Sequence, residues 1–383
     1  MAHPHSNLFL IIAVGTGLFF ILGISWQWSR TVSEQEGLFA ASAALQPLSQ
    51  SPAIRLRRKQ KPEQRTVKAL YLTAYSAGTP AKIDAIIDLI NRTELNAIVI
   101  DVKDYSGRIL YDSNLVWVEE FKAEKNQLGD ARALIQKLHD AGIYAIARQT
   151  VFQDPLLAER KPEWALKNKK GKLWRDYKGL AWVDPAEASV WRYNLAIARE
   201  AIRLGFDEIN FDYVRFPSDG DMSAVVFTNE GKKQHEVMRE FFLFLNENLS
   251  HEPAWISIDM FGFAMERTDG MGIGQRIEDA ADAVDYIAPM MYPSHYPAGH
   301  LGLANPAEHP AQVIENGMTL GTPKFKGVRA KLRPWIQAFN LGAVYDGDMI
   351  RAEIDAVEKY TDAGWMLWNA ANRYSDAGLN IEY

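Results

Sequence analysis

Ionisable side chains gather at the C-terminal end of a strand predicted over residues 205–217. Because side chains alternate along a strand, Asn210 and Asp212 share one face and Phe211 lies on the other. A carboxylate at that position stands at the mouth of whatever the strand encloses, where partial burial can tune its pKa for acid, base or nucleophilic chemistry. A purely structural ion pair between Asp212 and Arg215 is the competing interpretation.

A second carboxylate, Asp259, lies late in the next predicted strand. Two carboxylates that face each other across a sugar are what hydrolysis of a glycosidic bond requires, so we expect Asp212 to act as nucleophile or base and Asp259 as general acid. A separation of about 5 to 5.5 Å would predict retention of anomeric configuration, and about 6.5 to 9.5 Å inversion. A hydrogen-bonded structural carboxylate is the alternative for Asp259. Glu208 is expected on the outer face, without a catalytic role.

Further polar and aromatic residues recur late in predicted strands or in the loops that follow them. Charged members of this set would grip sugar hydroxyls or orient the carboxylate pair, and Asp101 is also a candidate acid. Flat aromatic rings would stack on the C–H face of a sugar. The expected substrate-binding residues are Asp101, Lys103, Asp104, Arg148, Trp182, Arg215, Tyr292, His295, Gln337 and Trp368.

The elements that must position these residues alternate between short apolar strands and amphipathic helices from Val67 onward. This alternation predicts parallel strands joined by helical crossovers, and eight strands over about 315 residues favour a closed (β/α)8 TIM barrel with enlarged loops over an open sheet. Active sites of such barrels lie at the C-terminal ends of the strands. The strands are expected at 67–75, 96–104, 143–152, 207–216, 254–263, 284–292, 334–339 and 364–370, and helices at 80–91, 128–141, 187–204 and 231–249, with 297–333 poorly marked.

The N-terminal residues have a different character. Residues 1–28 are predicted to be a transmembrane anchor, because residues 8–24 are almost wholly apolar and long enough to cross a bilayer. A cleaved signal peptide is the alternative, but the apolar run is longer than usual for one. Residues 29–65 are expected to form a flexible linker with a basic end, and residues 66–383 the barrel. We expect the barrel to lie outside the cytoplasmic membrane, although the charges flanking the span weakly favour the opposite orientation.

Composition narrows the possible partners. The net charge is -6 and no basic stripe with interleaved aromatics is present, so we expect no nucleic-acid partner. The absence of cysteine rules out disulfides and thiolate metal sites, and the histidines lack the spacing of a hydrolytic zinc site. Neither glycine-rich segment continues as a nucleotide-binding loop. We therefore expect no metal and no cofactor.

Four segments together resemble a bacterial family of glycosyl hydrolase domains, over roughly residues 67 to 375. These segments are residues 96–104, 176–184, 206–217 and 286–293. The family is similar to TIM-barrel glycosidases of the α-amylase type, and this resemblance implies a nucleophile at Asp212 and an acid/base at Asp259. The chain departs from the amylase pattern at two positions, with Asp259 where those enzymes use Glu and Gln337 where they place a third acid.

The sequence thus predicts a membrane-anchored glycoside hydrolase acting on an extracytoplasmic polysaccharide. A non-catalytic glycan-binding or cell-envelope scaffold protein with the same fold is the main alternative. A metal-dependent deacetylase is the third possibility.

Overall fold

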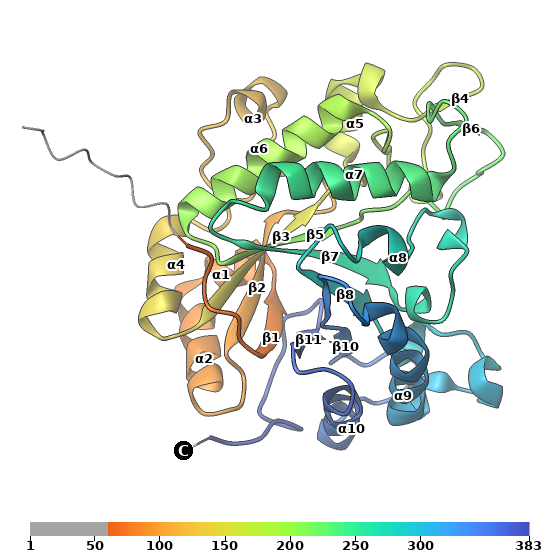
Figure 1. Cartoon of the computed structure of the whole chain (residues 1–383). Helices are drawn as coiled ribbons and strands as arrows, with labels where there is room; N and C mark the ends of the chain where they lie inside the picture. Colours follow the sequence, from red (N-terminus) through yellow and green to blue (C-terminus); the bar gives the residue numbers. More distant parts are fainter. Residues whose placement is uncertain (1–59, 383) are drawn as a thin grey trace, which may run out of the picture. The chain divides into compact units, whose positions relative to one another are not determined.

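The computed structural model describes residues 60–382. Eight parallel strands form a closed ring with helices between them, so the predicted (β/α)8 barrel is confirmed for these residues (Figure 1). Each strand falls within one of the eight predicted segments. The strands are β1 (Val67–Leu72), β2 (Ala97–Lys103), β3 (Tyr144–Thr150), β5 (Glu208–Asp212), β7 (Trp255–Phe261), β8 (Tyr286–Met290), β10 (Trp335–Gln337) and β11 (Gly364–Trp368).

The ring closes at β10, a strand of only three residues. Trp335 of β10 pairs in parallel with Met366 of β11 on one side and with Met290 of β8 on the other. Because both edges of this short strand are paired, the eight-stranded ring has no open edge. A further short strand, β9 (Lys331–Leu332), pairs with the start of β8.

Local sequence signals explain several helix boundaries. Asp130 caps the helix that follows it by accepting a hydrogen bond from the backbone N–H of Ala133, and Gly205 ends a long helix in the left-handed conformation. The helices are α1 (Ala74–Ala77), α2 (Pro80–Asn91), α3 (Val116–Phe121), α4 (Ala131–Asp140), α5 (Pro155–Arg160), α6 (Ala188–Leu204), α7 (Gln234–Leu249), α8 (Ile277–Ala280), α9 (Pro310–Gly321) and α10 (Gly347–Glu358). All four predicted helices are present, and the poorly marked segment 297–333 holds α9 among short 3-10 turns.

Several loops at the C-terminal ends of strands are enlarged, and two of them meet each other. The chain takes residues 151–187 to pass from β3 to α6 and residues 213–233 to pass from β5 to α7. These loops meet in a small antiparallel sheet formed by β4 (Lys167–Asn168) and β6 (Val225–Val226). The expected enlargement of the loops is therefore present on this side of the barrel.

Polar residues continue to the bottom of the barrel interior, where the expectation for Glu208 was wrong. Glu208 is fully buried and forms an ion pair with the equally buried Arg333. Its other oxygen accepts a hydrogen bond from the Tyr144 hydroxyl at 3.1 Å. Strand alternation gives the reason, because Glu208 has the same parity as Asn210 and Asp212 and so shares their inward face.

The predicted transmembrane anchor at residues 1–28 lies outside the described residues, as does nearly all of the predicted linker at 29–65. Within residues 60–382 no helix combines the length and apolar character that crossing a bilayer requires. Lys61 already contacts the barrel, donating to Asp285 at 3.0 Å and lying over the ring of Trp255.

Removing one member of the Glu208–Arg333 pair should destabilise the protein more than replacing both members. We expect Glu208→Gln to lower the free energy of unfolding by about 3–5 kcal/mol, because it leaves a buried guanidinium without a counter-ion. The double variant Glu208→Gln/Arg333→Met should lose less than the single variant. Urea unfolding of the three proteins measures this, and a single-variant loss under about 0.5 kcal/mol, the range of ordinary surface substitutions, would contradict it.

Candidate active site

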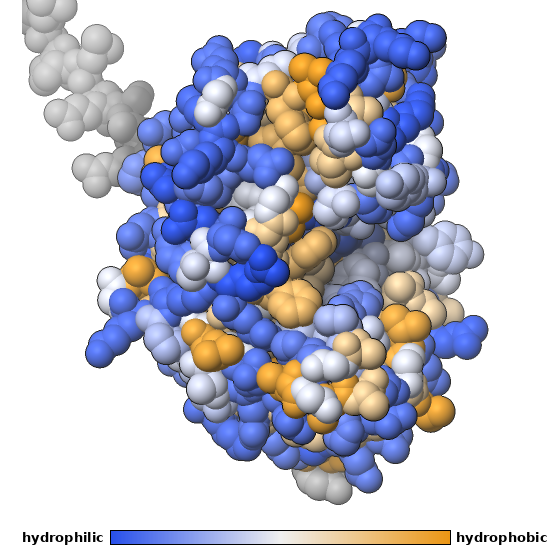
Figure 2. All heavy atoms as spheres, turned by 90° about the vertical axis from the view of Figure 1, so that its right-hand side faces the viewer, coloured by the Kyte–Doolittle hydropathy of each residue, from blue (hydrophilic) through white to orange (hydrophobic). Residues whose placement is uncertain are grey.

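A cavity of about 510 Å³ opens at the C-terminal end of the barrel. Figure 2, which views the molecule from the right-hand side of Figure 1, shows a hollowed apolar band bordered by hydrophilic residues. Both predicted catalytic carboxylates line this cavity, together with five of the predicted substrate-binding residues. These seven residues are Asp212, Asp259, Arg148, Arg215, Tyr292, His295 and Trp368.

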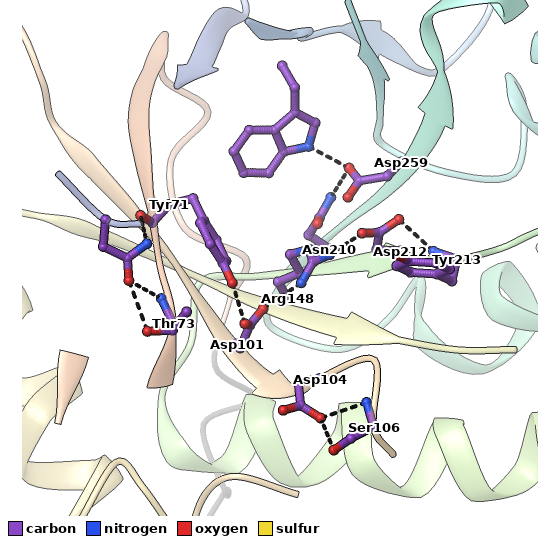
Figure 3. Close-up of polar contacts among 12 residues, drawn as sticks. Tyr71, Thr73, Asp101, Asp104, Ser106, Arg148, Asn210, Asp212, Tyr213 and Asp259 are labelled. Atoms are coloured by element: carbon purple, nitrogen blue, oxygen red, sulfur yellow. Dashed lines mark hydrogen bonds and ion pairs between the residues drawn. The ribbon is translucent and has the colours of Figure 1, made fainter. Parts of the chain in front are cut away.

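Asp212 ends β5, and both of its carboxylate oxygens are held. One oxygen accepts a hydrogen bond from the backbone N–H of Tyr213 at 2.6 Å, and the other forms an ion pair with the Arg148 guanidinium (Figure 3). Tyr213 adopts a left-handed backbone conformation with φ of 53°, which non-glycine residues rarely take. The chain thus accepts a strained residue directly after Asp212, as is often seen at functional sites. The alternative pairing of Asp212 with Arg215 is not formed.

Arg148 joins Asp212 to a second carboxylate. Its other terminal nitrogen donates to Asp101 at 2.6 Å, and the far oxygen of Asp101 accepts from the Tyr71 hydroxyl at 2.5 Å. Burial alone would lower the pKa of Arg148, but the charges of Asp212 and Asp101 outweigh it and the pKa is raised well above its ordinary value. Arg148 therefore stays charged, and its guanidinium is held between the two carboxylates.

Asp259, on β7, has neutral neighbours. One oxygen accepts hydrogen bonds from the side-chain amide of Asn210 at 2.9 Å and from the Trp335 indole N–H at 2.8 Å (Figure 3). Burial, followed by the charge of Asp212, raises the pKa of Asp259 well above its ordinary value, and the charge of Arg148 only partly offsets this. The two carboxylates therefore differ in environment, since one is paired with a cation and the other is favoured in its protonated form.

Such a pair can divide acid and base work between two residues of the same type. A carboxyl group kept protonated can give a proton to a leaving oxygen, while an ionised carboxylate attacks carbon or takes a proton from water. In addition, no group of three or more His, Asp or Glu side chains within residues 60–382 is arranged to hold a metal ion.

Aromatic rings form much of the cavity wall. Trp368 stacks on Tyr71 with ring centroids 4.0 Å apart and lies near-parallel to Tyr292 at 6.5 Å. Tyr292 also meets the edge of His295 at 5.2 Å. Burial lowers the pKa of His295, so this ring favours its neutral form. Flat, largely neutral walls of this kind suit the C–H faces of sugar rings.

Three predicted substrate-binding residues on β2 and its loop lie outside the cavity lining. Asp101 is behind Arg148 and acts on the site through it. Lys103 is fully buried in an ion pair with Asp154 at 2.7 Å. The side chain of Asp104 accepts hydrogen bonds from Ser106 in the loop after β2.

Two further predicted residues also lie behind the cavity wall. Trp182 is buried and donates from its indole N–H to Asp176 at 3.1 Å. Gln337 is buried, and its side-chain amide bonds to backbone groups. It accepts from the N–H of Ser294 at 3.1 Å and donates to the carbonyl of Phe339 at 2.9 Å. Neither side chain is among those that line the cavity.

The sequence interpretation missed other lining residues, some of which strand alternation could have found. Trp335 shares the inward face of β10 with Gln337, and Phe261 shares that of β7 with Asp259. Gln275 could not be found in this way because it comes from an irregular loop. The missed lining residues are Tyr213, Phe261, Gly262, Phe263, Gln275, Met290, Tyr296 and Trp335.

Comparisons with solved structures extend this description. A hypothetical protein from Ruminiclostridium thermocellum is 38% identical over 53% of this chain and 98% of its own, with a TM-score of 0.47. The glycoside hydrolase domain of PgaB (BpsB) from Bordetella bronchiseptica is 13% identical over 83% of this chain and 97% of its own, with a TM-score of 0.57. The α-galactosidase TtGalA from Thermus thermophilus is 13% identical over 82% of this chain and 60% of its own, with a TM-score of 0.50. The last two similarities show a shared fold.

No curated protein sequence matches the chain. A family model described as "Putative glycosyl hydrolase domain" matches residues 69–374, a range that contains both cavity carboxylates. Because that match spans most of the chain, this protein belongs to the family of putative glycosyl hydrolase domains, and its barrel is glycoside hydrolase-like.

Proposed function

We propose that this protein hydrolyses glycosidic bonds of an extracytoplasmic polysaccharide, with Asp212 as nucleophile or base and Asp259 as general acid. The observation that carries the proposal is that both carboxylates line one cavity yet have opposite surroundings. Asp212 is paired with a permanent cation, whereas burial raises the pKa of Asp259. Glycosidases use such a difference to assign acid and base roles.

The hydrogen bonds of Asp259 indicate which oxygen carries the proton. One oxygen already accepts two N–H donors, from Asn210 and Trp335, so the proton resides on the other oxygen. This proton passes to the glycosidic oxygen as its bond to the anomeric carbon breaks. Asp212 then either forms a bond to the anomeric carbon, which water later hydrolyses, or takes a proton from the attacking water.

Asp212 is well prepared for this role because its position is fixed from two sides. The N–H of Tyr213 and the guanidinium of Arg148 each hold one oxygen, and Asp101 in turn holds Arg148. Supporting contacts of this kind keep a catalytic group within the small tolerance that reaction geometry allows. Trp368, Tyr292 and His295 would position sugar rings above the two acids.

The location of the protein is part of the same proposal and rests on residues 1–28. If these residues anchor the chain, the full-length protein should sediment with membranes and resist extraction by high salt. A variant lacking residues 1–28 should be recovered in the soluble fraction. Protease added to intact cells should cut the barrel domain if it lies outside the cytoplasmic membrane, and protection from protease would contradict that orientation.

Replacement of the proposed nucleophile should separate catalysis from folding. We expect Asp212→Asn to lower kcat by about 100-fold or more while the melting temperature changes little, because Arg148 keeps Asp101 as counter-ion and asparagine can still accept from Tyr213. Release of reducing ends from a polysaccharide panel measures activity, and Asp104→Asn, outside the cavity, is the matched control. Full activity of Asp212→Asn would refute the assignment.

Two further measurements distinguish the alternative functions. Glycan binding by the wild-type protein without release of reducing ends across the panel would favour the scaffold protein. Release of acetate from acetylated glycans that chelators abolish and added metal restores would favour the metal-dependent deacetylase.

The role of Asp259 as acid predicts that the variant Asp259→Asn loses activity but gains stability relative to wild type at higher pH. Because its pKa is raised in the folded state, we expect kcat/KM to fall as the pH rises through that pKa, where the proton is lost. The stability that Asp259 contributes should be fully present below its unfolded pKa of about 4 and be lost over the same rise in pH. Asp259→Asn should therefore be inactive yet gain melting temperature relative to wild type as pH increases. Parallel melting curves for the two proteins at all pH values would contradict this.

A further inference from the structure

Arg215 is a buried cation in the cavity wall that has no carboxylate partner. Its side chain is 7% exposed and lines the cavity, and within residues 60–382 it forms no ion pair. Burial lowers the pKa of Arg215, and the more distant charges of Tyr213, Asp219 and Asp212 offset this only in part. A buried charge without a counter-ion is costly, so its presence beside a cavity calls for an anion that enters from outside.

The guanidinium of Arg215 has one edge free. Nη1 donates to the Phe216 carbonyl at 3.0 Å and to the Ser218 hydroxyl at 3.2 Å, whereas Nε and Nη2 donate to no described protein atom. Neither of these two nitrogens is among the fully enclosed polar atoms that lack a partner. Two parallel N–H groups on one edge are the donor pair that binds a carboxylate through both oxygens.

Aromatic rings hold this edge in place. The guanidinium carbon lies 5.0 Å from the ring centroid of Trp182, 5.4 Å from that of Tyr213 and 4.9 Å from that of Phe261. Phe261 has no hydrogen-bond donor and the indole N–H of Trp182 already donates to Asp176, so these two rings add no hydrogen bond to the anion. A planar group with two oxygens therefore fits better than a sulfate or phosphate, whose additional oxygens would face ring carbon atoms.

Positive charge continues outside the cavity on the enlarged loop that carries β4. Residues 160–178 hold eight lysine and arginine side chains against two acidic ones, in a chain whose net charge is -6. Lys169, Lys170, Lys172 and Lys178 are exposed and form no ion pair within residues 60–382. This basic loop also supports Arg215, because Asp176 accepts from the indole N–H of Trp182, whose ring Arg215 contacts.

We propose that the glycan taken by this cavity is acidic, a uronate-containing polysaccharide whose sugar carboxylate binds the Nε–Nη2 edge of Arg215 while the basic loop attracts the rest of the chain. This inference rests on the proposed glycosidase function for its location but makes a separate claim about charge. The lysines act at longer range than Arg215 and should mainly speed association, an effect that salt screens.

The test compares each acidic oligosaccharide with its own carboxyl-reduced form, which keeps ring and linkage but removes the charge. The probes are oligogalacturonate, oligoglucuronate and alginate oligosaccharides, titrated by calorimetry into the full-length Asp212→Asn variant so that binding is measured without turnover. For at least one pair we expect the acidic form to bind roughly 10- to 100-fold more tightly, the gain typical of hydrogen bonds to a charged group. Equal binding of both members in every pair would overturn the proposal, and so would a preference for sulfated or phosphorylated glycans.

Variants assign the preference to Arg215. In the same background, Arg215→Gln should remove the preference for the acidic form, and Arg215→Lys should restore only part of it because the ammonium lacks the paired donors. Arg132→Gln, on the exposed face of α4, is the matched control and should keep it. If the Arg215 variants fail to fold, the wild-type comparison with carboxyl-reduced ligands still decides. A preference that survives in folded Arg215→Gln would overturn the assignment.

A charge-matched pair of double variants tests the basic loop. Lys170→Gln/Lys172→Gln should slow association with the acidic ligand several-fold at low salt and flatten its salt dependence. Lys125→Gln/Lys326→Gln removes the same charge elsewhere and should change neither. Identical salt dependence in both variants would exclude a role for the loop.

Binding of acidic glycans without hydrolysis would refute the glycosidase proposal alone, whereas hydrolysis of neutral and acidic glycans at equal rates would refute only the inference about charge.

Discussion

The C-terminal end of the barrel depends on one interaction, in which the Arg148 guanidinium is shared between the carboxylates of Asp101 and Asp212. Tyr71, Asp101, Arg148 and Asp212 come from β1, β2, β3 and β5, which are consecutive neighbours in the sheet. All four are buried, and charges taken out of water are costly unless they are paired. The same contacts therefore fix four strands relative to one another and keep Asp212 in a defined position with a cation beside it.

On the side of the cavity formed by β7, neutral groups hold the second carboxylate, Asp259. Asn210 bridges to Ser257 and Asp259, and Trp335 reaches Asp259 from β10, two strands further along the ring. No cation lies in direct contact with Asp259, so burial governs its proton affinity. Two aspartates on adjacent strands thereby acquire different chemistry from their surroundings alone, as acid and base pairs of glycosidases do.

Periodicity allowed the eight strands and the inward position of Asp212 and Asp259 to be predicted, because buried parallel strands leave a strong pattern. It failed where the backbone departs from regular alternation. Asp101 and Lys103 have the same parity, but the pairing of β2 with β3 shifts register between them, and Lys103 emerges against Asn194 of α6 instead of facing the cavity. Trp182 lies in a long irregular loop, for which no periodic signal exists. Glu208 was wrongly assigned although its parity with Asp212 was readable.

Residue type alone does not distinguish the ion pair that lines the cavity from the one that is sealed in the core of this barrel. Glu208 with Arg333 and Asp212 with Arg148 are the same chemical pairs on the same strand face, one at the bottom and one at the top. The two pairs differ in the loops that surround them. Most connections from helix to strand are short, for example from Leu204 of α6 to Glu208 of β5, although residues 322–334 between α9 and β10 form a longer one that includes Arg333. The connections from β3 to α6 and from β5 to α7 run over residues 151–187 and 213–233. The bottom pair is fully buried, whereas the long loops build walls around the top pair without covering it. Loop length on one side of the ring thus converts a packing interaction into a site with access to a ligand.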